Sequence, residues 1–127
     1  MITRKDHRAF SLGLKLLKLS LHSRYQMIAL LYKGGRLISV GVNKEEAAPK
    51  TYIKDRRANL HLHAEISALH GIDKKDCKNG TIYVVGKTRA ENFLMSKPCW
   101  ICLNWMYNMG IKRIVYHDRL GELLELE

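Results

Sequence analysis

The sequence contains few cysteines, few prolines and no long hydrophobic run, and each of these absences excludes a class of protein. Among the 127 residues there are only three cysteines and two prolines. An odd number of cysteines, together with the lack of an apolar N-terminal segment of the signal-peptide kind, argues against a disulfide-bonded secreted domain. No apolar run approaches the roughly 20 residues that a membrane-spanning helix needs. We therefore expect a cytoplasmic protein with no membrane partner.

Acidic residues are also scarce, because 12 aspartates and glutamates face 22 lysines and arginines, which gives a formal net charge of +10. A chain of this length is expected to form a single domain over residues 1–127. So large an excess of positive charge favours anionic partners, either nucleotides or single-stranded nucleic acid, without choosing between them. The basic residues in the predicted loops are Lys44, Lys50, Lys54, Arg56, Arg57, Lys87, Arg89 and Lys97.

The spacing of apolar and turn-forming residues predicts alternating helices and strands. The predicted elements are a helix over 6–20, strands over 25–32 and 36–42, a helix over 64–70, a strand over 81–86, a helix over 98–109, a strand over 113–117 and a short edge hairpin in the tail. This order is typical of a three-layer α/β/α fold, with a central mixed sheet of four to five strands and helices on both faces. The strands over 81–86 and 113–117 are joined by a helix and should be parallel.

Two motifs, far apart in the sequence, contain the candidate metal-binding and catalytic residues. The first is His63-Ala64-Glu65, and the second is Pro98-Cys99-Trp100-Ile101-Cys102. One imidazole and two thiolates suit a catalytic zinc site, because three protein ligands leave the fourth tetrahedral position open for water. Glu65 is two residues from a predicted ligand and is therefore within reach of that water. We expect His63, Cys99 and Cys102 to be the zinc ligands and Glu65 to be the catalytic acid and base.

The cysteine motif also predicts its own local structure. Cys99 and Cys102 are three residues apart, which places both thiols on one face of a helix. Pro98 suits the first helical position, where its missing N–H has no cost. Thiols at the N-terminus of a helix lose their protons more readily, and the thiolate is the form that binds metal.

Two other interpretations of the cysteines are open at this stage. Cys77 could act as a fourth ligand and close a purely structural zinc site. We disfavour this because Cys77 lies in a polar stretch, residues 76–80, that is typical of a surface turn. A redox role for the Cys-x-x-Cys motif would leave His63 and Glu65 unexplained.

The combined pattern, His-x-Glu followed by Pro-Cys-x-x-Cys, resembles the cytidine/deoxycytidylate deaminase superfamily of zinc-dependent nucleobase deaminases. The residues 41–43 (Gly-Val-Asn) and 110–116 look most like the deoxycytidylate deaminase branch. The resemblance implies a cytidine deaminase-like fold and a Zn²⁺ cofactor. It also implies that a zinc-activated water attacks C4 of cytosine or C6 of adenine, while Glu65 carries the protons and ammonia leaves.

The resemblance further implies three substrate contacts. The backbone N–H of Ala64 would contact the base, and the backbone carbonyl of Lys97 would accept a hydrogen bond from the amine. Asn43 matches the family asparagine that contacts the sugar. Purine deaminases of the group commonly have glutamate before Pro-Cys, where this chain has Lys97 after Ser96, so we expect cytosine rather than adenine. The phosphate of the nucleotide would be held by basic loops at 44–57 and 87–97.

Two alternatives to an enzyme that acts on free nucleotides remain open. One is a nucleic-acid deaminase that acts on cytosine or adenine in single-stranded DNA or tRNA, and the other is a non-catalytic, nucleotide-binding subunit of deaminase-like fold. A homo-oligomer is also expected, because the predicted helices have more apolar surface than one sheet face can cover. The residues behind this expectation are the leucines of the first helix and Trp100, Trp105, Met106, Tyr107 and Met109.

Overall fold

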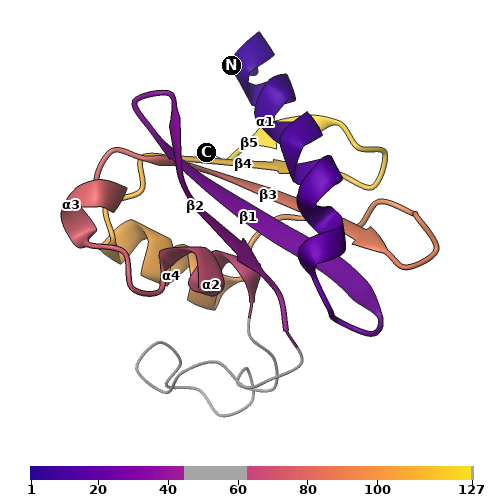
Figure 1. Ribbon diagram of the computed structural model, residues 1–127. Helices are drawn as coiled ribbons and strands as arrows, with labels where there is room; N and C mark the ends of the chain where they lie inside the picture. Colours follow the sequence, from indigo (N-terminus) through magenta and orange to yellow (C-terminus); the bar gives the residue numbers. More distant parts are fainter. Residues whose placement is uncertain (45–62, 127) are drawn as a thin grey trace.

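The computed structural model describes residues 1–44 and 63–126, in which five strands form one sheet (Figure 1). The elements are α1 (Arg4–Leu16), a 3₁₀ turn (Leu17–Leu19), β1 (Tyr25–Lys33), β2 (Arg36–Val42), α2 (Ala64–Leu69), α3 (Lys74–Cys77), β3 (Thr81–Thr88), α4 (Trp100–Asn108), β4 (Arg113–His117) and β5 (Leu123–Glu125). None of the helices in these ranges is long and apolar enough to span a membrane.

The sheet is mixed, and its strand order is β2-β1-β3-β4-β5. β1 runs antiparallel to both β2 and β3, with Ile28 opposite Val42 on one side and opposite Val85 on the other. β3 and β4 are parallel and are joined through α4, which confirms the predicted crossover. β5 returns antiparallel to β4 and forms the edge hairpin predicted for the tail.

Helices cover both faces of the sheet, so the predicted three-layer arrangement is confirmed (Figure 1). Successive residues of β1 point to opposite faces, as expected for a strand buried on both sides. Ile28 and Leu30 belong to the core under α1, whereas Ala29 and Leu31 belong to the core under α2 and α4.

Close contact between α2 and the sheet fixes where α2 begins. A Cβ on Gly41 of β2 would lie 2.1 Å from the backbone nitrogen of Ala68, so only glycine allows the helix to approach this closely. The hydroxyl of Ser39 also donates to the carbonyl of Ala68, over 2.7 Å. The same Cβ would lie 2.4 Å from the carbonyl oxygen of Ala64, so the N-terminus of α2, and with it His63, lies against the end of β2.

Two predicted helix starts need correction, and the first helix ends at Leu16, before the 3₁₀ turn, rather than at Ser20. α1 begins at Arg4 rather than Asp6, because Asp6 accepts a hydrogen bond from the backbone N–H of Thr3 (2.8 Å) and so caps the first turn. α4 begins at Trp100, and Cys99 precedes it with extended backbone as the N-cap residue. Pro98 therefore lies before the helix and does not occupy its first position.

The predicted surface turn is found at Lys78 and Asn79, but the expectation that Cys77 itself lies at the surface is wrong. Residues Lys74–Cys77 form the short helix α3, and the Cys77 side chain is completely buried in the same core as Leu31 and Met106. One turn of helix has an inward face, and the small, apolar thiol occupies it. Burial raises the pKa of Cys77, so its thiol stays neutral.

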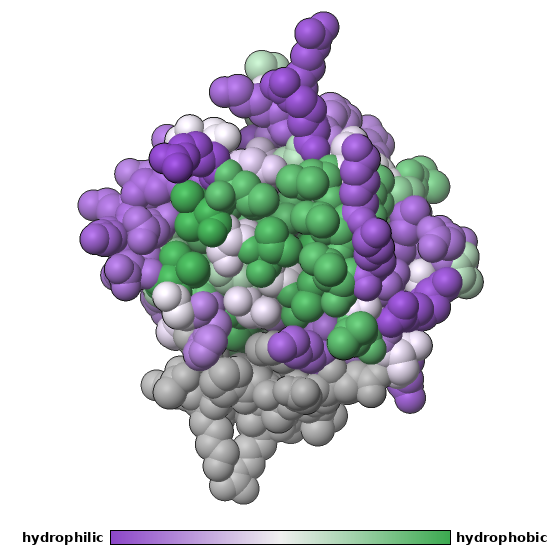
Figure 2. Space-filling view, viewed as in Figure 1, coloured by the Kyte–Doolittle hydropathy of each residue, from purple (hydrophilic) through white to green (hydrophobic). Residues whose placement is uncertain are grey.

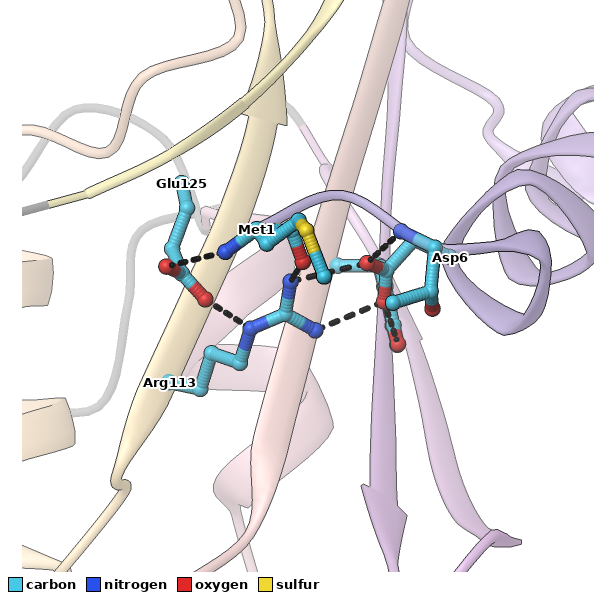
Figure 3. A network of polar contacts seen from close by, with 6 residues as sticks. Met1, Asp6, Arg113 and Glu125 are labelled. Carbon is cyan, nitrogen blue, oxygen red and sulfur yellow. Dashed lines mark hydrogen bonds and ion pairs between the residues drawn. The ribbon is translucent and has the colours of Figure 1, made fainter.

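An ion-pair network joins α1 to the far edge of the sheet (Figure 3). Arg113 of β4 donates from Nη1 to Oδ1 of Asp6 over 2.6 Å and from Nη2 to Oδ2 over 2.8 Å, and its Nε contacts Glu125. The hydroxyl of Tyr83 donates to the same Asp6 carboxylate over 2.6 Å. Burial alone would raise the pKa of Asp6, but these donors outweigh it and hold that pKa well below its usual range.

An apolar area is exposed beside α1, over β1 and β2 (Figure 2). α1 packs on β1 and β3, so the face of the edge strand β2 that lies on the α1 side is largely uncovered, whereas α2 packs on its other face. The exposed large apolar side chains of this region are Leu19, Leu37, Ile38 and Val40. Trp100 and Tyr107 of α4 are exposed as well, whereas Met106 is fully buried, contrary to its predicted place on an association surface.

Candidate metal centre and catalytic pocket

His63, Cys99 and Cys102 come together at the starts of α2 and α4. His63 is the N-cap residue of α2, Cys99 is the N-cap residue of α4, and Cys102 lies in the first turn of α4. The Nδ1 atom of His63 lies 3.2 Å from Sγ of Cys102 and 3.5 Å from Sγ of Cys99. All three potential ligand atoms lie within 4.8 Å of one another.

These separations suit a tetrahedral metal ion. Zinc bonds of about 2.0–2.1 Å to nitrogen and 2.3 Å to sulfur place neighbouring ligand atoms about 3.5–3.8 Å apart. Cys77 is not part of the group that the described residues form here, so the structure does not support a closed four-ligand site. One coordination position is left for water or substrate, as in catalytic sites.

The two thiols of the group differ in charge state. A hydrogen bond from the Cys102 thiol, assisted by His63, lowers the pKa of Cys99 well below that of a free thiol. The same hydrogen bond, together with burial, raises the pKa of Cys102. Hydrogen bonding to Cys99 raises the pKa of His63. One thiolate is thus favoured before any metal arrives, and a divalent cation would favour the second.

Glu65 is buried beside the three ligands and is 5% exposed. It lies in the first turn of α2, two residues after His63, as the sequence predicts. Burial raises the pKa of its carboxyl group. The described residues place no lysine or arginine in an ion pair with it, so the carboxyl group is available to exchange protons inside the pocket.

A pocket of about 430 Å³ opens onto the group. It is lined by Tyr25, Met27, Asn43, His63, Ala64, Glu65, Leu94, Met95, Lys97, Cys99 and Arg119. Every site residue predicted from the sequence lines this pocket except Cys102, which is fully buried behind it. This volume lies in the range of small-molecule binding sites.

Asn43 lines the pocket, and its side chain also forms hydrogen bonds that stabilise the fold. Its Oδ1 accepts from the Ser20 hydroxyl over 2.5 Å and from the Met27 backbone N–H over 2.8 Å, and its Nδ2 donates to the Tyr25 carbonyl over 3.2 Å. The amide carries two N–H bonds, and within residues 1–44 and 63–126 only one of them has an acceptor. Asn43 therefore fixes the start of β1 while it faces the pocket.

Sequence reasoning missed five pocket residues, which are Tyr25, Met27, Leu94, Met95 and Arg119. Arg119 belongs to the turn between β4 and β5, and no local pattern in the sequence indicates that this turn reaches the pocket. Of the basic loop residues singled out from the sequence, Lys97 lines the pocket. Lys50, Lys54, Arg56 and Arg57 lie outside the described residues.

The family comparison agrees with this geometry. The sequence profile described as "Cytidine and deoxycytidylate deaminase zinc-binding region" matches residues 3–118. The chain belongs to this family. The family is a zinc-binding one, and the His63, Cys99 and Cys102 side chains form a group that fits the ion, so Zn²⁺ is the cofactor of this deaminase-family protein. No protein among the curated sequences matches the chain.

Solved structures of similar fold include members of the same family. The dCMP deaminase of cyanophage S-TIM5 in its apo form is 17% identical, with a TM-score of 0.60 over 92% of this chain and 86% of the phage chain. The same phage enzyme in complex with dCMP and dUMP is 16% identical, with a TM-score of 0.60, covering 93% and 85%. RibD of Acinetobacter baumannii is 19% identical with a TM-score of 0.57, and the match covers 91% of this chain but 28% of RibD. At these identities the likeness establishes the fold.

Proposed function

We propose that the protein is a zinc-dependent hydrolytic deaminase that converts cytosine to uracil in a nucleotide and releases ammonia. The observation that carries this proposal is the union of three zinc-type ligands and a buried carboxylic acid at one pocket. Three ligands leave a position for water, and the acid supplies the proton transfers that hydrolysis of an amine requires. The phage dCMP deaminase that shares the fold was solved with dCMP and dUMP, which supports a nucleotide substrate.

In this proposal His63, Cys99 and Cys102 hold the metal. Zinc held by these residues would activate a water near neutral pH. Glu65 accepts a proton from this water and passes it to the ring nitrogen of the base, and a second proton then goes to the departing amine. One water is consumed and one ammonia is released for each uracil formed.

The walls of the pocket orient the base. Ala64, at the first position of α2, lines the pocket, and its backbone N–H is proposed to donate to the base. The carbonyl of Lys97 is proposed to accept from the exocyclic amine, and Asn43 to donate its remaining N–H to the sugar. Met27, Leu94 and Met95 supply the apolar surface against which a planar ring packs.

Cytosine is proposed over adenine because Lys97, rather than the glutamate common in purine deaminases, precedes Pro98. A panel of cytidine, deoxycytidine, their monophosphates and oligonucleotides that contain cytosine or adenine tests the proposal through ammonia release. Release from cytosine nucleotides is expected. Release confined to adenine-containing RNA would assign the protein to the nucleic-acid deaminases, and release from none of them would favour a binding subunit.

We also propose that the protein self-associates. The exposed apolar area (Figure 2) includes Leu37, Ile38 and Val40 of β2, which is an edge strand of the sheet that the described residues form. Trp100 and Tyr107 expose further apolar surface on α4.

A further inference from the structure

Arg89 lies at the tip of a hairpin that leads from β3 to the wall of the catalytic pocket. The Thr88 N–H donates to the Asn92 carbonyl over 2.8 Å, which closes the turn around Arg89. Beyond the turn the chain pairs back with β3, since the Leu94 N–H donates to the Gly86 carbonyl over 3.1 Å. Leu94 then lines the pocket. The tip of the hairpin and one pocket wall are therefore parts of one hydrogen-bonded unit.

The other contacts of Arg89 are with residues 20–24, the segment that connects the 3₁₀ turn to β1. Its Nε donates to the His22 carbonyl over 2.9 Å, and its Nη2 donates to the same carbonyl and, over 3.3 Å, to that of Ser20. Its backbone N–H donates to the Arg24 carbonyl over 3.4 Å. One residue thus holds the carbonyls of three alternate positions in a segment without regular secondary structure.

The guanidinium group is suited to this role. Its donors lie in one fixed plane, so a single side chain can hold two carbonyls at once, and a charged donor makes a stronger hydrogen bond than a neutral one. Arg89 is exposed, but it is not one of the described residues that line the pocket. The Nε and Nη2 atoms that could bind an anion are bound to the protein's own backbone.

The segment that Arg89 holds orients Asn43, one of the pocket residues. The Ser20 side chain is fully buried, and its hydroxyl donates to Oδ1 of Asn43 over 2.5 Å. Asn43 is 3% exposed and lines the pocket from the end of β2. Because Arg89 binds the carbonyl of Ser20, movement of that backbone would move the hydroxyl that orients the Asn43 amide.

The same segment positions Tyr25, a second pocket residue. His22 is buried, and its Nδ1 accepts from the N–H of Arg24 over 3.1 Å and from that of Tyr25 over 3.4 Å. The His22 and Tyr25 rings pack together with their centroids 4.2 Å apart. Arg89 binds the carbonyl of His22, so it fixes the residue against which the Tyr25 ring packs.

We infer that Arg89 is a positioning residue for the pocket wall formed by Tyr25 and Asn43. It acts through the backbones of Ser20 and His22, whose side chains orient the two pocket residues. The inference deepens the proposed function and rests on it for the contact between Asn43 and the sugar. Loss of the Arg89 side chain should weaken substrate binding and spare the metal site, whose ligands belong to the starts of α2 and α4.

Steady-state kinetics of the zinc-loaded protein test this inference with deoxycytidine and its 5′-monophosphate. The variants are Arg89→Gln, Arg89→Lys and the matched control Arg36→Gln, an exposed arginine at the other end of β1. We expect both Arg89 variants to raise KM by about three- to tenfold, equally for the two substrates, and to change kcat by less than about twofold. Lysine should not rescue, because one ammonium group lacks the planar set of donors. The control should change neither constant.

Two further measurements follow the route from Arg89 to the pocket. In Arg89→Gln, hydrogen exchange should become faster in residues 20–27, which include the Met27 N–H bound to Asn43, and should stay unchanged in β4. Ser20→Ala removes the hydroxyl that orients Asn43. The KM effect of Arg89→Gln should be smaller in this background than in wild type, because both substitutions act through Asn43.

The outcomes separate this inference from the proposed function. A KM rise confined to the monophosphate and restored by Arg89→Lys would make Arg89 a phosphate contact and overturn the inference. Unchanged exchange in residues 20–27, or additive effects of Arg89→Gln and Ser20→Ala on KM, would also overturn it. Absence of turnover by wild type, with faster exchange in residues 20–27 of Arg89→Gln but not of Arg36→Gln, would contradict the proposed function and support the positioning role. Turnover by wild type with no kinetic effect of Arg89→Gln would do the reverse.

Discussion

The Nδ1 atom of His63 lies 3.2 Å from Sγ of Cys102, although the two residues are 39 positions apart and belong to the starts of different helices. The contact joins the starts of α2 and α4, which lie on the same face of the sheet (Figure 1). In the zinc-loaded protein this junction would be bridged by the metal, so metal binding and the stability of the fold should be coupled.

Removal of zinc should lower the thermal midpoint of unfolding, because an ion that binds only the folded state stabilises that state. We expect one zinc per chain by elemental analysis and loss of this zinc in Cys102→Ser. The matched control is Cys77→Ser, which changes a buried thiol in the core and should keep the metal. Loss of zinc from the control would return Cys77 to the ligand set.

Lowering the pH should reduce the free energy of unfolding, because Asp6 becomes protonated. The pKa of Asp6 is lower in the folded state than in the unfolded chain, where it is about 3.9. The stabilisation is therefore complete above about pH 5 and is lost as the pH falls through the folded pKa. Asp6→Asn should lower the free energy of unfolding by about 3 kcal/mol at pH 7, since it leaves Arg113 poorly paired. In urea titrations this difference should shrink toward pH 3.

The exposed pair Lys87–Glu91 provides the control for Asp6. Its Nζ and Oε2 atoms are 3.5 Å apart, and the Glu91 side chain is 78% exposed. Glu91→Gln should change the free energy of unfolding by less than about 1 kcal/mol. A difference between wild type and Asp6→Asn that stayed constant from pH 7 to pH 3 would contradict the role given to Asp6.

Ser96→Ala should destabilise the protein by about 1–3 kcal/mol, because the buried His117 N–H and Val84 carbonyl both lose their hydroxyl partner. It should also raise KM for a monophosphate more than KM for the nucleoside, since the segment that carries Lys97 loses its hydroxyl bonds to Val84 and His117 and keeps only the Ser96 N–H bond to the His117 carbonyl. Chemical denaturation and steady-state kinetics measure the two effects. Ser11→Ala, on the exposed side of α1, should change neither.

Self-association should be visible by light scattering at about 50 µM, a concentration that detects a weak but specific interface. Ile38→Glu places a charge in the apolar area on β2 and should shift the protein toward the monomer. Wild-type protein that scatters as a monomer at this concentration would refute the proposed assembly.

The sequence is sufficient to predict much of the fold, because apolar alternation and turn residues are local signals. The bounds of β2 and β4 are those predicted, as is the parallel pairing of β3 with β4. The start of α4 was misplaced because a proline before a helix can lie at the first helical position or just outside it. The burial of Cys77 was not predicted, because its neighbours in the sequence are polar. Only one face of a helix as short as α3 points into the core, and Cys77 lies on it.

Some residues of the candidate site could likewise be predicted from the sequence, and others could not. His63, Glu65, Cys99 and Cys102 are found from spacing, since two short motifs fix their types and order. Arg119 is not, because it reaches the pocket only through the fold of the β4–β5 turn and its contacts with Phe93 and His117. The internal hydrogen bonds of Asn43 likewise depend on Ser20, Tyr25 and Met27, which the fold brings around it.

Production of the uracil nucleotide from deoxycytidine 5′-monophosphate, followed by chromatography for zinc-loaded wild type and Glu65→Gln side by side, tests the central claim most directly. We expect wild type to turn over and the variant, with its zinc and thermal midpoint retained, to be slower by at least about 10²–10⁴-fold, because the proton carrier is gone. Equal rates in the two proteins, or no product from wild type, would contradict the account.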